Sequence, residues 1–196
     1  RVIFGEKIAN ADKTADGLAI RNTFDLLHKK FVHAGGILGK IENYFPQNIH
    51  NPAKVGATPF VKWKDDMMSY VDNNKMVDPN TGLPFTRGGL ENAMKGAYEG
   101  IRTNGLNEVV ERANSGKLTY GKGGGVALRH SSSRFFHFKD ADSFLAYNRK
   151  YGYGDAGLFD AMLGHISAMS RDIGLMEELG AKPDNQFQRI KLQVEA

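Results

Sequence analysis

The chain has 196 residues, enough for one domain with a buried core or one domain with an extra lobe. Its 26 basic and 22 acidic residues give a net charge of +4, which is more typical of a solvated surface than of a dedicated nucleic-acid-binding face. The lack of cysteine excludes disulfides, zinc–thiolate sites and a cysteine nucleophile, and no apolar run is long enough to predict a membrane-spanning helix.

Apolar side chains recur at spacings of three and four residues in the first half of the chain and predict three helices there. Their apolar stripes are Ile20, Phe24, Leu27 and Phe31, then Phe60, Trp63, Met67 and Val71, then Leu90, Met94, Ala97, Tyr98 and Ile101. Thr58, followed by Pro59, is the predicted N-cap of the second helix, and Thr86 is that of the third. Gly35-Gly36 ends the first helix, and an ordered loop over 44–52 and a turn over 78–82 are expected between the helices.

The second half begins with a predicted short helix over 106–113 and a glycine-rich connector over 115–125. The aromatic segment 134–138 is the best strand candidate in the chain. Asp140 is expected to cap a helix over 141–151, and Asp155 a longer helix over 158–179 that ends at Gly180. A further helix is expected to start near Asn185.

The long predicted helix carries a heptad-like seam that is typical of packing between helices. Its members are Phe159, Met162, Ile166, Met169, Ile173 and Met176. In an extended segment over 134–139, Phe136 and Phe138 lie on one face. We therefore expect this aromatic segment to dock on the methionine-lined helix.

Together these patterns predict a mainly α fold, an irregular helical bundle with long loops and at most one short β element near 134–139. The predicted organisation is an N-terminal helical part over 1–114, the connector over 115–125, and a C-terminal part over 126–196. The chain starts without Met and its last residues resemble the middle of a helix, so we expect a piece of a longer protein.

Six polar side chains form the most pronounced cluster of chemically active groups, and we interpret them as a structural polar network. They are Arg129, His130, Arg134, His137, His165 and Asp172. His165 and Asp172 are seven residues apart, on one side of a helix and about 10 Å apart along its axis. In this interpretation a histidine or arginine pairs with Asp172, and neither catalysis nor a cofactor is expected.

The alternative interpretation is a metal site for a hydrolase, made by His130, His137, His165 and Asp172. The P-loop-like stretch from Gly116 to Lys122 fails its context test because Gly123 stands where Ser or Thr would hold magnesium. No strand is predicted before it and no helix directly after it. The pattern therefore favours a linker.

Five basic residues are candidates for contacts with a partner or with a DNA backbone. They are Lys29, Lys30, Lys139, Arg149 and Lys150. The last three lie in a basic stretch that runs from 129 to 150. This distribution leaves a non-specific DNA-binding module open as a further alternative.

Two blocks of sequence resemble stretches of large bacteriophage proteins. The first runs from Asn43 to Val55 and is followed by the helix that contains Trp63. The second combines Arg129-His130, the segment from Phe136 to Asp142, and Ala146-Tyr147-Asn148 with later residues of the long helix. Those later residues are Gly164, His165, Ile166, Met169, Ser170, Arg171, Asp172 and Ile173, followed by Leu179, Gly180, Pro183 and Asp184. In their order and spacing these blocks are similar to the internal virion (ejection) and large polyvalent proteins of podovirus type.

The resemblance implies a structural, oligomer-forming role and carries over no catalytic residue. Proteins of this family are packaged inside the virion, leave with the genome, and help to form a passage for DNA across the host envelope. The expected partners are therefore other copies of the chain and other virion proteins, with possible non-specific contacts to the DNA backbone. The alternatives that remain are a metal-assisted hydrolase domain of a polyvalent protein and a non-specific DNA-binding module.

Overall fold

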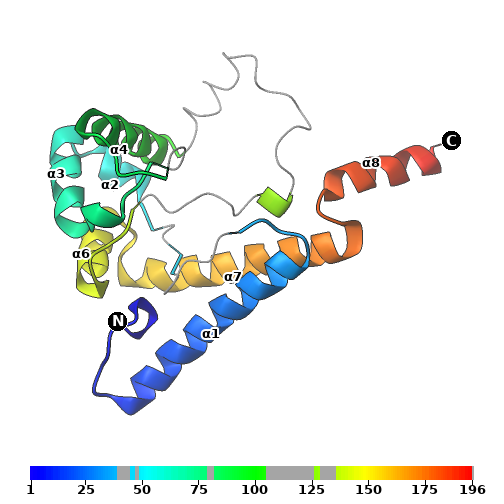
Figure 1. The fold of residues 1–196 in the computed structure, drawn as a ribbon, viewed down its shortest axis with the longest axis horizontal. Coiled ribbons are helices and arrows are strands. Elements are labelled where there is room, and N and C mark those ends of the chain that lie inside the picture. Colours follow the sequence, from blue (N-terminus) through cyan, green and yellow to red (C-terminus); the bar gives the residue numbers. More distant parts are fainter. Residues whose placement is uncertain (39–44, 47–48, 79–81, 105–125, 129–135, 196) are drawn as a thin grey trace. The chain divides into compact units, whose positions relative to one another are not determined.

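A computed structural model describes residues 1–38, 45–46, 49–78, 82–104, 126–128 and 136–195 (Figure 1). Within these ranges the chain contains seven α-helices and no β-strand, which confirms the predicted mainly α fold. The helix predicted over 106–113 and the connector over 115–125 lie outside the described residues.

The helices follow one another with short connections where the chain is described. They are α1 (Ala11–His33), α2 (Pro52–Gly56), α3 (Phe60–Tyr70), α4 (Arg87–Arg102), α6 (Ala141–Tyr151), α7 (Gly154–Leu179) and α8 (Pro183–Val194). Short 3-10 helices are η1 (Val2–Phe4), η2 (Asn73–Lys75) and η3 (Val126–Leu128). Helix α2 was not predicted: the expected loop over 44–52 ends where it begins, and no element was predicted for residues 53–56.

Side-chain caps explain why two of the helices begin where they do. The Thr86 hydroxyl accepts a hydrogen bond from the Gly89 amide at 3.1 Å, and an Asp140 carboxylate oxygen accepts one from the Ser143 amide at 2.7 Å. Each cap satisfies a backbone N–H that has no partner within the first turn. Both caps agree with the sequence prediction.

Two other predicted helix starts are corrected by the structure. Helix α3 begins at Phe60 without a side-chain cap, and the Thr58 hydroxyl donates instead to the Lys54 carbonyl at 3.1 Å. The reason is α2, which ends just before Thr58 and offers it an unpaired carbonyl one turn back. Helix α7 begins at Gly154, so Asp155 lies in its first turn and does not precede it.

The chain forms two compact units, and each combines stretches from both sides of residues 115–125. Unit 1 contains Arg1–Pro46, Thr119–Ser133 and Met162–Ala196, and unit 2 contains Gln47–Leu118 and Arg134–Ala161. The units therefore differ from the predicted division into 1–114 and 126–196. They interleave because segments of the second half pack on helices of the first half, and α7 contributes to both units.

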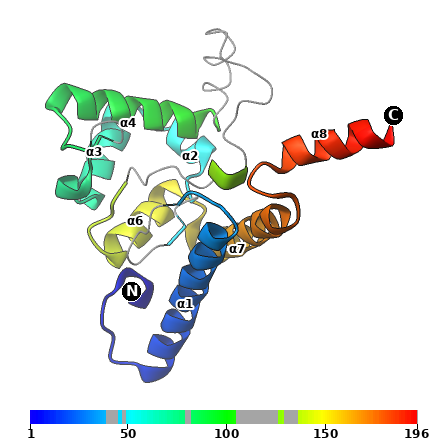
Figure 2. The same ribbon diagram turned by 45° about the vertical axis from the view of Figure 1, so that its right-hand side comes forward.

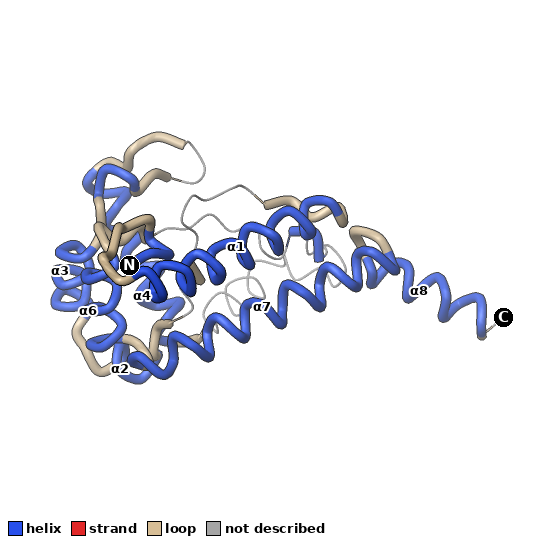
Figure 3. The backbone as a smooth tube through the Cα atoms, turned by 90° about the horizontal axis from the view of Figure 1, so that it is seen from below, coloured by secondary structure: helices blue, strands red, loops and turns tan. Residues whose placement is uncertain are grey.

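Unit 1 is built on α1 and the part of α7 that follows Met162, which lie side by side in all three views (Figures 1, 2 and 3). Its core contains Val2, Phe24, Leu27, Phe31, Phe45, Val126, Ala127, Met169, Ile173 and Met176. At the start of α1, η1 approaches closely at Gly17, where an added Cβ would lie 2.6 Å from the Val2 Cβ. A side chain at position 17 would therefore displace η1.

Helix α8 extends away from the rest of unit 1 (Figures 2 and 3). The chain turns into it at Gly180, which ends α7 with a left-handed φ of 78°. Except at Asp184, whose side chain the structure does not describe, every residue of α8 after Pro183 is exposed. The helix predicted near Asn185 is thus present, and it is the least covered of the described helices.

Unit 2 is a cluster of four helices in which α4 packs on α2 and α3, and α6 packs on the same two helices. The segment that precedes α6 runs antiparallel to the end of α3 and forms a single bridge between Val71 and Phe138. The Asp72 amide donates to the His137 carbonyl at 2.7 Å, and the Lys139 amide donates to the Tyr70 carbonyl at 3.0 Å. The sequence predicted a strand over 134–138; within the described residues this segment forms only the single bridge at Phe138, and residues 134–135 lie outside them.

The N-cap at Asp140 provides a first test of the fold. Replacing Asp140 with Ala leaves the Ser143 amide without its acceptor, so we expect the free energy of unfolding to fall by about 1 kcal/mol. In a chain of this size that corresponds to a melting temperature lower by about 2–4 °C. Asp142→Ala removes the same charge from the same turn without removing the cap. An equal loss of stability in the two variants, measured by thermal or denaturant unfolding, would show that the cap is not the cause.

Candidate functional site

The structure divides the predicted polar network between the two units. Arg129, His130 and Arg134 lie outside the described residues. His137 belongs to unit 2, whereas His165 and Asp172 belong to unit 1. The described members therefore do not form one cluster within a single compact unit.

His165 and Asp172 both face the interior side of α7. The His165 ring packs against Phe24 of α1 with ring centroids 5.8 Å apart. The Asp172 side chain is completely buried, and one carboxylate oxygen lies 3.6 Å from Nε of Arg171. This is the environment of groups built into the core between two helices.

The described residues contain no group of three or more histidine, aspartate or glutamate side chains arranged to hold a metal ion. Of the four predicted ligands, His165 and Asp172 lie in one unit, His137 lies in the other, and His130 is outside the described residues. Within the part of the chain that the structure describes, the geometry offers the predicted metal site no support.

Three of the five predicted contact cations have acceptors within unit 2. Lys139 Nζ donates to the Ser69 carbonyl at 2.6 Å, and Lys150 Nζ lies 2.6 Å from an Asp66 oxygen. Arg149 Nε lies 3.4 Å from Asp155 in a pair that is mostly exposed. Lysines 139 and 150 thus connect the segments of unit 2 to one another.

The two remaining cations, Lys29 and Lys30, are exposed near the end of α1. Positive charge at the C-terminal end of a helix interacts favourably with the partial negative charge of its last carbonyl groups. This interaction accounts for the position of Lys30 in the last turn, and Lys29 lies just before that turn.

Sequence reasoning missed the central polar group of unit 2, which is the hydroxyl of Tyr147. This residue comes from α6 and is completely buried. The Trp63 indole N–H donates to the hydroxyl oxygen at 3.3 Å, and Nδ1 of His50 lies 2.9 Å from the same oxygen. Three segments that are distant in sequence meet at one atom.

The direction of one of these hydrogen bonds follows from the chemistry of its donor. An indole N–H can only donate, so the Tyr147 oxygen accepts from Trp63. The Tyr147 hydroxyl and Nδ1 of His50 share the second hydrogen bond, and the tautomer of the neutral imidazole sets which of the two donates. Burial lowers the pKa of His50 from 6.5 to about 4, and burial also raises the pKa of Tyr147. Both shifts keep the pair uncharged at neutral pH.

Aromatic rings surround this polar centre. The ring of Phe136 meets His50 and Trp63 edge to face, each at 6.0 Å between ring centroids. Phe138 meets Phe144 edge to face at 5.2 Å and lies 5.4 Å from Tyr147. Pairs of this kind contribute about 0.5–1.5 kcal/mol each beyond the burial of their surfaces.

The predicted docking of the aromatic segment on the methionine-lined helix is wrong. Phe136 and Phe138 pack with side chains of unit 2, whereas Met169, Ile173 and Met176 are core residues of unit 1. The backbone pairing of 137–139 with the end of α3 fixes both phenylalanines over α3 and α6. Trp63, Phe144 and Tyr147 supply larger aromatic surfaces there than methionine would.

Asp66 forms a second polar centre at the edge of unit 2. It accepts hydrogen bonds from Lys150 and from the hydroxyl of Tyr151, and it lies 3.6 Å from Lys62. The hydrogen bond from Lys150 is the main reason that the pKa of the Asp66 carboxyl lies below its usual value. The carboxylate thereby ties α3 to the last turn of α6 and stays ionised.

A backbone bridge and several hydrogen bonds join the segment before α2 to the end of α6, and we call this contact the clasp. His50 and Gly152 form an antiparallel bridge, and the Asn51 amide donates to the Tyr151 carbonyl at 2.9 Å. Lys54 Nζ donates to the Gly152 carbonyl at 2.7 Å. Asn148, fully buried, donates from its side-chain nitrogen to the Gly154 carbonyl at 2.7 Å. This clasp places His50 over Tyr147.

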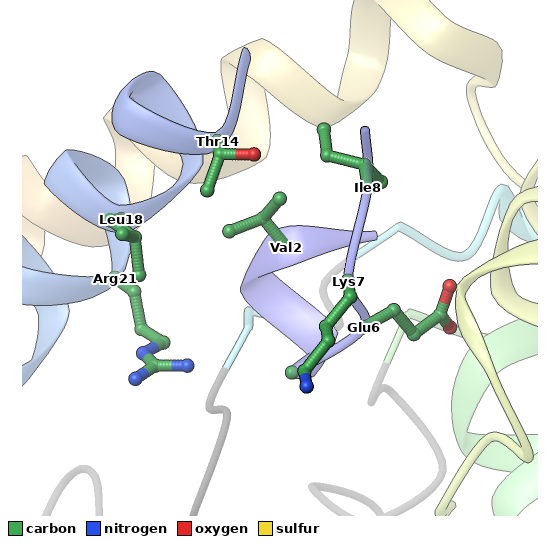
Figure 4. A pocket seen from close by; sticks show the side chains of 8 residues that line it. Val2, Glu6, Lys7, Ile8, Thr14, Leu18 and Arg21 are labelled. Atoms are coloured by element: carbon green, nitrogen blue, oxygen red, sulfur yellow. The ribbon is translucent and has the colours of Figure 1, made fainter. Parts of the chain in front are cut away.

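Unit 1 contains an open pocket of about 300 Å³ between η1, the loop after it and α1 (Figure 4). Val2, Ile8 and Leu18 give it an apolar lining, and Glu6, Lys7, Thr14 and Arg21 give it polar edges. The Thr14 hydroxyl donates to the Asn10 carbonyl, which is a local helix contact.

Comparison with known proteins supplies no identification. No protein-family model matches the sequence, and neither the characterised proteins nor the solved structures provide a match. None of the described helices combines the length and apolar character needed to cross a bilayer. Any conclusion about function therefore depends on the residues and their geometry.

The buried His50 predicts an acid-dependent loss of stability. Its pKa is about 4 in the folded chain and 6.5 when exposed, so the unfolded chain binds a proton that the folded chain does not between these values. The free energy of unfolding is therefore highest above pH 6.5 and falls as the pH drops towards 4, by at most about 3 kcal/mol. Denaturant unfolding at a series of pH values measures this slope.

His50→Gln keeps a hydrogen-bonding side chain but removes the titration, so its unfolding free energy should depend less on pH over the same range. His33→Gln changes an exposed histidine at the end of α1 and serves as the matched control. If the His50 variant keeps the full pH slope of the natural chain, the buried imidazole is not its origin.

The clasp predicts that Gly152 does not tolerate a side chain. An added Cβ would lie 2.1 Å from Oδ1 of Asn148 and 2.6 Å from the Ile49 carbonyl oxygen, so the backbone pairing must shift. We expect Gly152→Ala to lower the unfolding free energy by about 1–3 kcal/mol. Gly96→Ala, at an open position inside α4, should stabilise the chain by about 0.5–1 kcal/mol. Equal effects of the two substitutions would contradict the close approach at Gly152.

Proposed function

We propose that this chain is a structural segment of a bacteriophage internal virion (ejection) protein of podovirus type. It assembles inside the particle with other copies of itself and with other virion proteins. After delivery to the host cell envelope it assists the passage of the genome. In this proposal the 196 residues act by assembly and carry out no catalytic step.

The observation that carries the proposal is the exposed apolar face of α8. Phe187, Ile190 and Val194 follow one another at spacings of three and four residues, and they are 61%, 46% and 81% exposed. Scattered exposed apolar residues are ordinary, but a regular stripe on a projecting helix is typical of an interaction surface. A helix of this kind supports a role in assembly.

The polar residues of unit 2 support the same conclusion. Three groups that could have acted as acid, base or ligand hold the unit together. His50 and Tyr147 bond to each other inside an aromatic shell, and Asp66 is occupied by Lys150 and Tyr151. This arrangement favours a scaffold over a reaction centre, which needs such groups to face a substrate.

No observation supports either alternative as strongly as the exposed stripe of α8 supports assembly. A metal-assisted hydrolase needs ligands that converge, and the described candidates are divided between the two units. A non-specific DNA-binding module needs cations that face solvent; Lys139 and Lys150 bond to acceptors of their own chain, whereas Lys29, Lys30 and Arg149 are exposed. The experiment below includes one result that would favour each alternative.

Sedimentation velocity of the purified chain over a wide range of concentrations tests the proposal. We expect defined oligomers that dissociate on dilution, because the exposed stripe is covered only in the assembled state. A strictly monomeric chain at every concentration contradicts the proposal. Stoichiometric bound metal would instead favour the hydrolase, and duplex binding that weakens steeply with salt would favour the DNA-binding module.

A further inference from the structure

We propose that the clasp opens in acid: protonation of His50 releases residues 49–51 from the end of α6, while α3 and α6 stay joined through Asp66. The proposal concerns unit 2 alone and does not depend on the assembly function. It describes a conformational switch with two contacts, one that responds to pH and one that keeps its charge over the same range.

The responsive contact is the hydrogen bond between Nδ1 of His50 and the hydroxyl of Tyr147, which are 2.9 Å apart. The same oxygen accepts the indole N–H of Trp63 at 3.3 Å. In a neutral imidazole one nitrogen donates and the other accepts, whereas in an imidazolium both nitrogens donate. Protonation therefore directs two donors to one oxygen and excludes His50 as an acceptor for the Tyr147 proton.

The surroundings of His50 disfavour a positive charge. Among the described residues, its ring contacts Tyr147 and Phe136 and its backbone pairs with Gly152, so none of these contacts supplies a carboxylate. Burial is the cause that lowers the pKa of His50 from 6.5 to about 4. The ring is still partly exposed, so solvent protons reach it. The imidazolium gains hydration when the segment that carries it moves into water.

The charged and titratable groups on the helices around the clasp do not compensate an imidazolium. On α2, Lys54 is itself a cation, and its Nζ donates to the Gly152 carbonyl at 2.7 Å. On α6, Tyr147 and Tyr151 both have a raised pKa, chiefly because of burial, and stay neutral in acid. On α3, Asp66 already accepts hydrogen bonds from α6.

The second contact keeps its charge where His50 takes up a proton. The hydrogen bond from Lys150, followed by that from Tyr151, holds the pKa of the Asp66 carboxyl below its usual value of 3.8. A depressed carboxyl pKa contributes stability that is lost only as the pH falls through that lower value. Helix α3 and the last turn of α6 therefore remain joined between pH 6.5 and 4.

Helix α2 has its own anchors and does not need the clasp. It packs on α4, Val55 is completely buried, and the hydroxyl of Tyr98 donates to the Thr58 carbonyl at 2.7 Å. The side chain of Asn51 accepts hydrogen bonds from the first amides of α2, which is a local contact. Residues 49–51 can therefore turn away at the start of α2 while the helix stays in place.

The two pKa values of His50 set how strongly acid favours opening. A group with a pKa of about 4 in the closed form and 6.5 in the open form shifts the equilibrium towards opening by up to about 300-fold as the pH falls through this range. Ile49 is completely buried in the closed form, so its burial opposes opening at neutral pH. Opening is thus rare at pH 7 and becomes populated towards pH 4.

The single tryptophan of the chain reports on this change. Trp63 is completely buried and donates to the hydroxyl that His50 covers. Between pH 6.5 and 4 we expect its emission to move to longer wavelength and its quenching by acrylamide to rise several-fold. Helix content measured by circular dichroism should stay constant over the same range. If Trp63 remains shielded down to pH 4, or if helix content falls together with the fluorescence change, local opening of the clasp is overturned.

His50→Gln removes the titration but keeps a side chain able to bond to the Tyr147 hydroxyl. This variant should have the emission of the natural chain at pH 7, which shows that it folds, and should lose the acid transition. His33→Gln, at an exposed position in unit 1, should keep the transition. A transition of natural size in the His50 variant contradicts the proposal.

Asp66→Asn tests the second contact. The variant loses the carboxylate that accepts from Lys150 and Tyr151, so it should unfold at lower denaturant concentration at neutral pH. Its Trp63 transition should keep the midpoint of the natural chain, because His50 is still present to titrate. A transition that disappears in this variant and survives in His50→Gln assigns the acid response to the carboxylate and rejects His50 as its origin.

Discussion

The side chain of Tyr147 joins three segments of unit 2, through hydrogen bonds to its hydroxyl and through contacts of its ring. Its oxygen accepts a hydrogen bond from the Trp63 indole N–H and its hydroxyl shares a second one with Nδ1 of His50, while its ring lies among Phe138, Tyr70 and Tyr151. A buried hydroxyl without partners would cost free energy, so the aromatic core is stable only where both nitrogen groups meet it. That requirement and the hydrogen bonds at Tyr151 and Gly152 together fix the position of His50 at the start of α2.

The same requirement explains why the compact units do not follow the chain order. His50 and Tyr147 are separated by 97 residues, and each satisfies a need of the other. Segment 136–139 pairs with the end of α3 and delivers Phe136 and Phe138 to the same core. A glycine-rich sequence predicts a connector, but long-range contacts decide which segments form a unit. Unit 2 therefore includes both Trp63 and Tyr147 although residues 105–125 lie between them in the sequence.

Local signals predicted most of the helices, because capping and apolar spacing are local properties. Thr86 and Asp140 accept hydrogen bonds within three residues of themselves, so neighbouring sequence is sufficient to identify them. Thr58 misled the prediction because α2, a helix of five residues without a clear apolar stripe, offers it a carbonyl instead. The partner of the aromatic segment was beyond such reasoning, since spacing shows that Phe136 and Phe138 share a face but not which surface covers it. His50 gave no signal of its own: a single histidine in a loop acquires its role only from Tyr147.

The heptad-like seam on α7 shows that a regular spacing does not by itself tell which of its residues are buried. One heptad-like spacing runs from Phe159 to Met176, yet Met169, Ile173 and Met176 are buried and Phe159 is exposed. The buried half has a partner in unit 1, whereas the other half has the composition of a helix contact without one in the described chain. The spacing identifies the face of the helix that is able to pack, but the neighbouring residues of unit 1 decide how far along that face the packing extends.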